Sequence, residues 1–175
     1  MIPHPLEKFR FCPACGSSQW VINNEKSKRC LSCGFVYYAN VSAAVATFIM
    51  NGKGELLVCR RKKDPAAGTL DLPGGFVDIG ETAKEAIARE INEELKLHVT
   101  KSWLISSIPN EYVYSGMKIN TLDMFFRCEV EDFTGMEAGD DVAEAFFMPV
   151  NTISPDDFGL NSIKKGIIAF LKENK

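Results

Sequence analysis

Residues 74–97 read GGFVDIGETAKEAIAREINEELKL and place an amphipathic helix directly after a glycine-rich loop. Thr82 followed by Glu85 is the pattern of a capping box, which predicts that the helix begins there. Apolar residues then recur at helical spacing, at Ala83, Ala86, Ile87, Ile91 and Leu95. The pattern predicts a helix over 82–96 with one face buried in a core.

The polar face of this helix carries Glu90, Glu93 and Glu94, with Arg89 beside them. Like charges three and four residues apart destabilise a helix by a few tenths of a kcal/mol per pair. A cluster of carboxylate oxygens is, however, the kind of ligand set that Mg²⁺ or Mn²⁺ prefers. The face is therefore a candidate metal site, and a solvated acidic surface is the alternative.

Strand patterns surround the helix on both sides. Upstream, residues 41–50 and 56–60 flank Asn51-Gly52, which is a strong hairpin signal, and a Pro- and Gly-rich loop follows over 64–75. Downstream, strand-like segments recur near 99–108, 121–131 and 145–150, and residues 161–172 form a second amphipathic helix. Mixed strands and helices with hairpins predict an α/β fold with a mixed sheet.

Four of the six cysteines come in two early pairs, Cys12–Cys15 and Cys30–Cys33, each followed by glycine. Two residues between cysteines let one tight turn direct both thiolates at a single ion. The segment between the pairs contains Trp20-Val21-Ile22 and an Asn23-Asn24 turn, so it is expected to form a hairpin. We therefore expect a structural four-cysteine zinc ribbon, with disulfides as the alternative.

The composition and charge of the chain limit the classes of protein to which it can belong. The chain has 175 residues, 46% of them apolar and 25% charged, which is typical of a globular protein. Residues 1–38 carry a net charge of +3 and the remainder −6, so we place a domain boundary near residue 39. No segment approaches the ~20 apolar residues of a membrane span. A cytoplasmic protein with no membrane partner is expected, and nucleic acid is an unfavoured partner because no overall basic excess exists.

The segment from Gly75 to Leu97 resembles the Nudix box, the signature of the Nudix hydrolases. Its fixed positions are Gly75, Glu81, Arg89-Glu90, Ile91, Glu93-Glu94 and Leu97. Lys96 departs from the pattern, because the family has a glycine there that ends the helix in a left-handed turn. A lysine in that conformation costs on the order of 1 kcal/mol, or else the helix continues past it.

The resemblance extends over residues 41–175, including the approach Arg60–Gly75 and the segment Glu144–Phe147. It implies a Nudix α/β/α sandwich on residues 39–175, preceded by the ribbon on 1–38. It also implies metal-dependent hydrolysis of a nucleoside diphosphate linked to another moiety. Metal ions held by carboxylates would polarise phosphoryl oxygens and activate the attacking water.

The resemblance also implies roles for single residues. Glu90 and Glu94 are the principal metal ligands, assisted by Glu93 and by the backbone carbonyl of Gly74. Arg89 and Glu81 are expected to pair and orient Glu90. The general base stays open between Glu93 and an acid of a later loop, for which the candidates are Asp141 and Glu144. Arg60 and Tyr38 are candidate substrate-binding residues, although a solvated arginine and a packed tyrosine are the ordinary alternatives.

A zinc ribbon before a Nudix domain resembles the NADH pyrophosphatase branch. That branch carries a Ser-Gln-Pro-Trp motif after the box, whereas residues 106–112 here read SSIPNEY. NAD(H), ADP-ribose and related nucleotide sugars therefore remain alternative substrates. A catalytically inactive Nudix ligand sensor and a nucleic-acid-binding ribbon module are alternatives of other classes. A homodimer, in which the ribbon could take part, is a further expectation.

Overall fold

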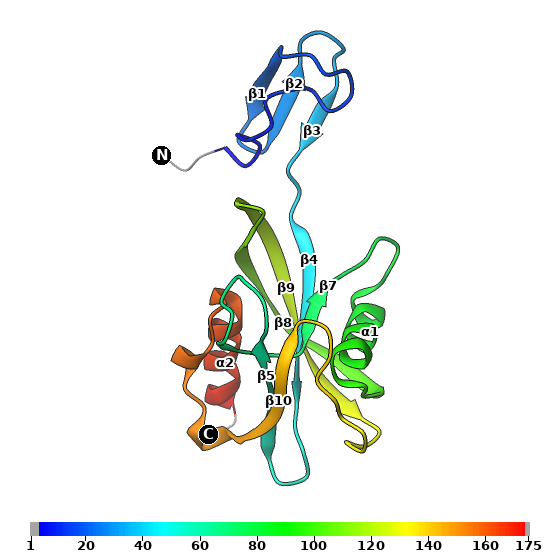
Figure 1. Ribbon diagram of the computed structural model, residues 1–175, viewed down its shortest axis with the longest axis vertical. Helices are drawn as coiled ribbons and strands as arrows, with labels where there is room; N and C mark the ends of the chain where they lie inside the picture. The colour runs from blue at the N-terminus through cyan, green and yellow to red at the C-terminus, as the bar shows by residue number, and fades with distance from the viewer. Residues whose placement is uncertain (1–3, 174–175) are drawn as a thin grey trace. The chain divides into compact units, whose positions relative to one another are not determined.

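The computed structural model describes residues 4–173 and divides them into two compact units (Figure 1). The first unit runs to Val41 and includes the hairpin tip Tyr112–Asn120. The second unit comprises Ser42–Glu111 and the chain from Thr121 onward.

The first unit is built on a three-stranded antiparallel sheet of β1 (Trp20–Asn24), β2 (Ser27–Cys30) and β3 (Val36–Tyr38). The hairpin between the cysteine pairs is β1–β2, in which Trp20 faces Cys30. The third strand has no counterpart in the sequence-based prediction. Its three residues are too few to show a period, and Tyr37 and Tyr38 are both exposed.

The second unit contains two sheets. One has the strand order β10-β5-β6, formed by β10 (Val142–Pro149), β5 (Glu55–Arg61) and β6 (Leu70–Asp71). The other has the order β7-β4-β9-β8, formed by β7 (Gly74–Phe76), β4 (Ser42–Ile49), β9 (Met117–Val130) and β8 (Val99–Tyr114). This second sheet is mixed, because β4 pairs with β9 in parallel and with β7 antiparallel.

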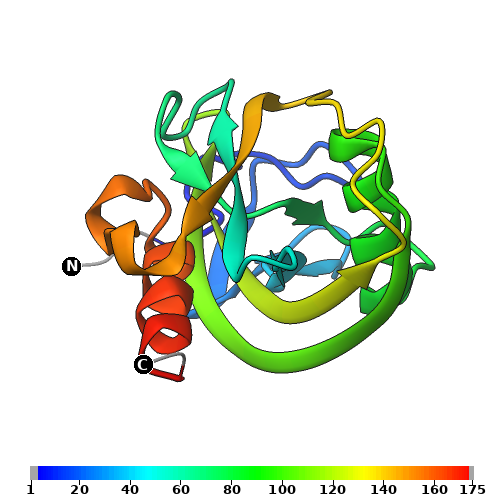
Figure 2. The same ribbon diagram turned by 90° about the horizontal axis from the view of Figure 1, so that it is seen from below.

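Two α-helices lie on opposite sides of these sheets (Figures 1 and 2). They are α1 (Ala83–Leu95) and α2 (Asn161–Glu173), and two short 3₁₀ helices, η1 (Val150–Thr152) and η2 (Pro155–Asp157), precede α2. The result is a helix–sheet–helix sandwich, which confirms the expected α/β fold with a mixed sheet. Neither helix, nor any other in residues 4–173, is long and apolar enough to span a membrane.

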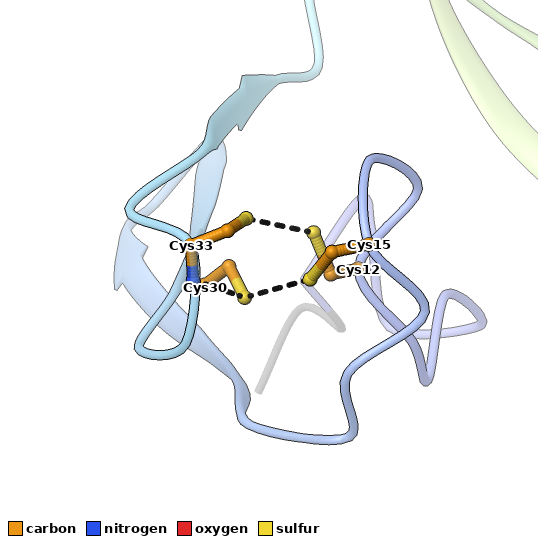
Figure 3. Close-up of side chains that lie close together, drawn as sticks. All are labelled: Cys12, Cys15, Cys30 and Cys33. Atoms are coloured by element: carbon orange, nitrogen blue, oxygen red, sulfur yellow. Dashed lines mark hydrogen bonds between the residues drawn. The ribbon is translucent and has the colours of Figure 1, made fainter.

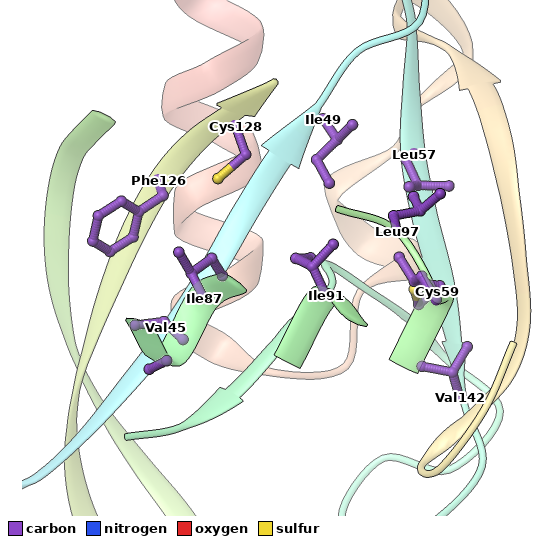
Figure 4. Packing of buried hydrophobic residues seen from close by; sticks show 12 residues of the cluster. Val45, Ile49, Leu57, Cys59, Ile87, Ile91, Leu97, Phe126, Cys128 and Val142 are labelled. Atoms are coloured by element: carbon purple, nitrogen blue, oxygen red, sulfur yellow. The ribbon is translucent and has the colours of Figure 1, made fainter. Parts of the chain in front are cut away.

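Each helix has its own hydrophobic cluster. On the α1 side, Ile87 and Ile91 are fully buried and pack with residues of β4, β5 and β9, as Figure 4 shows. On the α2 side, Phe48 stacks on Phe170 with 4.5 Å between ring centroids, and Gly166 lets α2 approach Phe125 closely. The α1 cluster fixes the apolar face of the helix, so its glutamate-bearing face is turned toward the loop that precedes it.

The ends of α1 show how the sequence limits the helix. Thr82 and Glu85 form the capping box with both reciprocal hydrogen bonds. At the other end Lys96 adopts the left-handed conformation, with φ 59° and ψ 23°, so the helix stops at Leu95. The lysine therefore adopts the strained conformation rather than extending the helix, because Leu97 is buried and must turn back into the core.

Candidate functional site

Gly74 and Gly75 begin β7, which pairs with β4 and lies close to α1. Gly74 has φ +147°, and a Cβ on it would lie 2.1 Å from the carbonyl oxygen of Val45. A Cβ on Gly75 would lie 2.5 Å from the carboxyl carbon of Glu90. Gly74 must be glycine, because its φ is positive and a Cβ would overlap the backbone of β4. The absence of a side chain at Gly75 leaves room for the carboxylate of Glu90.

Glu94 is the buried member of the acidic face, with 8% of its surface exposed. Its carboxylate accepts a hydrogen bond of 3.0 Å from the backbone N–H of Gly74. Burial raises the pKa of Glu94 to about 8, because the single hydrogen bond does not compensate the lost hydration. The negative charges of Glu90, Asp71 and Asp140 raise it further. A carboxylate in these surroundings is stabilised by a cation.

Arg89 joins the other acids of the site through several hydrogen bonds. It donates to both carboxylate oxygens of Glu81, at 2.9 and 3.0 Å, and to the carbonyl of Phe76. Its Nη1 also donates to Glu90 at 2.9 Å and to Glu93 at 3.0 Å. The guanidinium lowers the pKa of Glu81, so this carboxylate stays charged. Arg89 thereby ties the loop to the helix and orients Glu90.

The segment Glu137–Asp141 folds over the C-terminal end of α1. The backbone N–H groups of Glu137 and Gly139 donate to the carbonyls of Leu95 and Glu94. Asp140 has φ 47°, a conformation that Asp tolerates better than most residues. Its charge contributes to raising the pKa values of Glu90 and Glu94. Asp140 therefore contributes, as the smallest of the named causes, to the unfavourable negative charge around Glu90 and Glu94.

The two acids that the sequence singles out in this region, Asp141 and Glu144, have basic partners. Asp141 forms an ion pair with Lys63. Glu144 forms an ion pair of 3.3 Å with Arg60, whose guanidinium lies 5.7 Å from the ring centroid of Phe146. The Lys63–Asp141 pair ties the loop after β5 to the loop before β10, whereas the Arg60–Glu144 pair links the two paired strands themselves.

A buried pair lies behind the acidic face. Arg61 donates to Asp71 and to the carbonyl of Pro65. Burial raises the pKa of Asp71, although the Arg61 guanidinium opposes the shift. A small cavity of about 30 Å³ is bordered by Asp71, Glu94 and the buried thiol of Cys59.

These residues fit a hard divalent cation by their chemistry. The candidate side-chain ligands are all carboxylate oxygens, which hard cations prefer. Glu94 is buried, and the charged groups that act on it are negative. In this structure Glu90 and Glu93 are held by Arg89, so the three carboxylates of α1 do not converge on one point. An ion held by Glu90, Glu93, Glu94 and the carbonyl of Gly74 would compete with Arg89 for Glu90 and Glu93.

The four paired cysteines do converge, as Figure 3 shows. Their sulfur atoms all lie within 4.8 Å of one another, and no other group of three or more acidic, His or Cys side chains in residues 4–173 meets this distance. Cys12 and Cys30 are buried, Cys15 and Cys33 are exposed, and none forms a disulfide. Four clustered thiols are consistent with a zinc ribbon.

The remaining candidates lie apart along the chain. Tyr38 belongs to the first unit and is 45% exposed, whereas Arg60 belongs to the second and is engaged by Glu144. Sequence reasoning did not identify Asp140 or Asp71, nor the pairing of Arg61 with Asp71. The Gly139-Asp140 pair signals a left-handed turn, but no sequence pattern shows that this turn folds back onto the end of α1.

Comparison with known proteins identifies the domain. The family model described as NUDIX domain matches residues 41–169. The NAD-capped RNA hydrolase NudC of Vibrio parahaemolyticus is 26% identical over 114 residues, which are 65% of this chain and 43% of that protein. The protein of the same name from Haemophilus influenzae is 28% identical over 118 residues, 66% of this chain and 44% of its own length. The chain thus matches less than half the length of these relatives.

Solved structures share the fold. A NUDIX hydrolase from Nitrosomonas europaea superposes with a TM-score of 0.71 at 21% identity and covers 94% of this chain and 92% of its own. The NUDIX domain of Shewanella oneidensis NrtR, solved as a complex with ADP ribose, has a TM-score of 0.62 at 13% identity, covering 79% and 91%. The first of these extends over nearly the whole chain, ribbon included.

The pKa of Glu94 predicts a pH-dependent stability of the metal-free protein. Because the folded-state pKa lies above the ordinary value, ionisation of Glu94 costs stability as the pH rises from about 4.5 to about 8. Glu94→Gln removes this cost and keeps an acceptor for Gly74. We expect its melting temperature to exceed that of the wild type by several degrees at pH 8.5, roughly 2–4 °C per kcal/mol, and by little at pH 5. Equal gains at both pH values would contradict the burial account, and exposed Glu131→Gln is the control.

The cysteine cluster predicts bound zinc. The purified protein should contain about one zinc per chain, and Cys30→Ser should lose it because a buried thiolate ligand is removed. Proteolysis should then cleave the first unit while the second stays protected. Ser32→Ala, between the two cysteines of the same pair, is the matched control and should keep its zinc. Zinc retained at full occupancy by Cys30→Ser would refute the site.

Proposed function

The chain belongs to the Nudix family, and on that premise we propose that it is a metal-dependent pyrophosphohydrolase. Its substrate is a nucleoside diphosphate linked to another moiety, and water attacks phosphorus. The observation that carries this proposal is the buried carboxylate of Glu94, which is held by the N–H of Gly74 and surrounded by further acids. A purely structural glutamate gains nothing from this position, since its burial destabilises the folded chain.

A bound Mg²⁺ or Mn²⁺ would supply polarisation of phosphoryl oxygens and acidification of the attacking water. Glu90, Glu93 and Glu94 would hold it together with the carbonyl of Gly74. Arg89 positions Glu90 and Glu93 through its hydrogen bonds and is itself anchored by Glu81.

The proton of the attacking water requires a base near the acidic face. Glu93 is one candidate, since it is half-exposed and can exchange Arg89 for a water molecule. Among the acids of the later loop, Asp140 is favoured over Asp141 and Glu144. Asp141 is ion-paired with Lys63, and Glu144 with Arg60. The charge of Asp140 instead contributes to the raised pKa values of Glu90 and Glu94. Breaking those ion pairs would add to the cost of using Asp141 or Glu144.

Among substrates, we place NAD(H)-type dinucleotides first and ADP-ribose second. The relatives named NAD-capped RNA hydrolase support an NAD-linked substrate, and the neighbour solved with ADP ribose supports the second. Both contain a pyrophosphate that joins adenosine to a second ribosyl group, so one acidic face serves either. Arg60 and Tyr38 remain proposed substrate contacts. To bind substrate, Arg60 would have to break its ion pair with Glu144.

We propose that the chain divides near residue 39 into a zinc ribbon and a Nudix domain. The ribbon's role is proposed to be structural, because four thiolates leave no coordination position open. The free thiols also fit a reducing compartment, so we propose a cytoplasmic location.

The proposed activity predicts metal-dependent release of a mononucleotide. We expect hydrolysis of NADH, NAD⁺ or ADP-ribose with Mg²⁺ or Mn²⁺, and a loss in kcat of at least a hundredfold in Glu94→Gln. Exposed Glu131→Gln should keep wild-type activity. Nucleoside triphosphates and other nucleotide sugars complete the panel. Tight binding of one of these compounds without turnover would instead identify a ligand sensor, the alternative of another class.

The loop geometry predicts different effects for two adjacent aspartates. Asp140→Asn keeps a residue that tolerates the left-handed turn but removes the charge facing Glu90 and Glu94. We expect it to lower kcat/KM at least tenfold and to change the pH–rate profile. Asp141→Asn, which loses only the exposed ion pair with Lys63, should change the rate less than threefold. The opposite order of effects would assign the catalytic role to Asp141.

A further inference from the structure

Formal charge is divided unevenly between the two units. The first unit contains six Lys or Arg and two Glu, so its net charge is +4. The whole chain carries −3, so the rest of it carries −7. An excess of cations confined to one small unit is typical of a surface that meets a polyanion, and the charge of the whole chain conceals it.

The cations of the ribbon are not paired with acids. In the described residues 4–41, no Lys or Arg forms an ion pair. Lys8 and Lys28 donate instead to the backbone carbonyls of Gly116 and Phe9. The other three cations are exposed, and their charge is open to a ligand from solution. They are Arg10, Lys26 and Arg29.

Exposed aromatic side chains are concentrated in the same unit. Six of its described Phe and Tyr side chains have between 39% and 64% of their surface accessible, namely Phe9, Phe11, Phe35, Tyr37, Tyr38 and Tyr114. In the described part of the larger second unit, only Phe76 and Trp103 are comparably exposed. Bases of any identity stack on aromatic rings, so a cationic surface with exposed rings is typical of proteins that bind single strands.

One face of the ribbon sheet brings charge and ring together. The register of β1–β3 places Val21, Arg29 and Val36 in one row across the three strands. Tyr38 lies two residues beyond Val36 on β3, so its side chain projects from the same face. Arg29 is exposed, and Val21 and Tyr38 have 42% and 45% of their surface accessible. These four residues are named the ribbon sheet face below.

The opposite face of the sheet holds the cysteine cluster. Trp20 faces Cys30 in the neighbouring row, and both are buried with Cys12. Lys28, on the same side as Cys30, is also buried and donates to the carbonyl of Phe9. No hydrophobic cluster of the described chain includes a residue of the ribbon sheet face. The N-terminal segment therefore covers one side of the sheet and leaves the ribbon sheet face open.

We propose that the ribbon sheet face binds a single-stranded nucleic acid. The guanidinium of Arg29, at the centre of the face, pairs with a phosphate, and the ring of Tyr38 stacks on an unpaired base. Val21 and Val36 lie on either side of Arg29 and provide apolar contacts for sugar or base. Lys26 adds charge at the Tyr38 end, because its carbonyl accepts from the N–H that follows Tyr38 on the chain.

The occupant follows from charge and stacking together. A duplex hides its base faces in the stack, whereas an unpaired strand offers Tyr38 a base and Arg29 a phosphate at once. An acidic peptide would satisfy the charge without using the exposed ring of Tyr38. The inference goes beyond the proposed hydrolysis and does not depend on it, since the four residues belong to the first unit and none belongs to the acidic face.

The first test is binding of a fluorescein-labelled oligouridylate of about twelve nucleotides to the full chain, without added Mg²⁺ or Mn²⁺. Fluorescence anisotropy should show saturable binding that weakens on the order of tenfold between about 50 and 200 mM salt, because bound phosphates release counterions. An RNA duplex of the same length should bind at least fivefold more weakly. Absence of saturable binding at low salt, or equal affinity for the duplex, would overturn the proposal.

The second test assigns the binding to the ribbon sheet face. Arg29→Ala should weaken it at least fivefold, whereas Lys165→Ala removes an exposed cation of α2 and should leave it unchanged. Tyr38→Ser should also weaken it at least fivefold, while Tyr38→Phe keeps the ring and should bind within about twofold of the wild type. A zinc content equal to that of the wild type shows that each variant is folded. Equal effects of the two cation variants, or of the two Tyr38 variants, would contradict the assignment.

Discussion

The candidate site depends on the close approach of the Gly74–Gly75 backbone to β4 and α1. The approach places the N–H of Gly74 on Glu94 and the Cα of Gly75 against the carboxylate of Glu90. A Cβ at Gly74 would clash with the backbone of β4, and a Cβ at Gly75 would displace the carboxylate of Glu90. The apolar stripe of α1 resists rotation of the helix because Ile87 and Ile91 are fully buried. Loop and core together therefore hold acidic groups where hydration is poor.

This arrangement sets stability against function. Glu94 and Asp71 both have raised pKa values because they are buried, and each destabilises the metal-free fold when ionised. Arg89 offsets part of the charge by pairing with Glu81, Glu90 and Glu93. A divalent cation would offset the rest. The cysteine cluster of the first unit is separate from this site. Zinc bound there would supply folding energy that thirty-odd residues cannot gain from a hydrophobic core.

Much of the fold could be predicted, because the signals are local. The capping box at Thr82, the helical stripe through Ile91 and the Asn51-Gly52 turn each depend on neighbouring residues, and the predicted α/β class is confirmed. The short strands β3, β6 and β7 could not be found, because two or three residues show no period. The role of Asp140 could not be found either, since it depends on a loop returning to α1 from 45 residues further along the chain. The ribbon sheet face likewise became visible only with the register of β1–β3.

The most direct test of the account is proton release on metal binding. Titration calorimetry of Mg²⁺ or Mn²⁺ at pH 7, in two buffers of different ionisation enthalpy, reports how many protons leave the protein per ion. Because the pKa of Glu94 is about 8 without metal, we predict release of about one proton by the wild type and close to none by Glu94→Gln. Binding by the wild type without proton release would show that Glu94 is already ionised, and would contradict the account of a buried carboxylate that a cation stabilises.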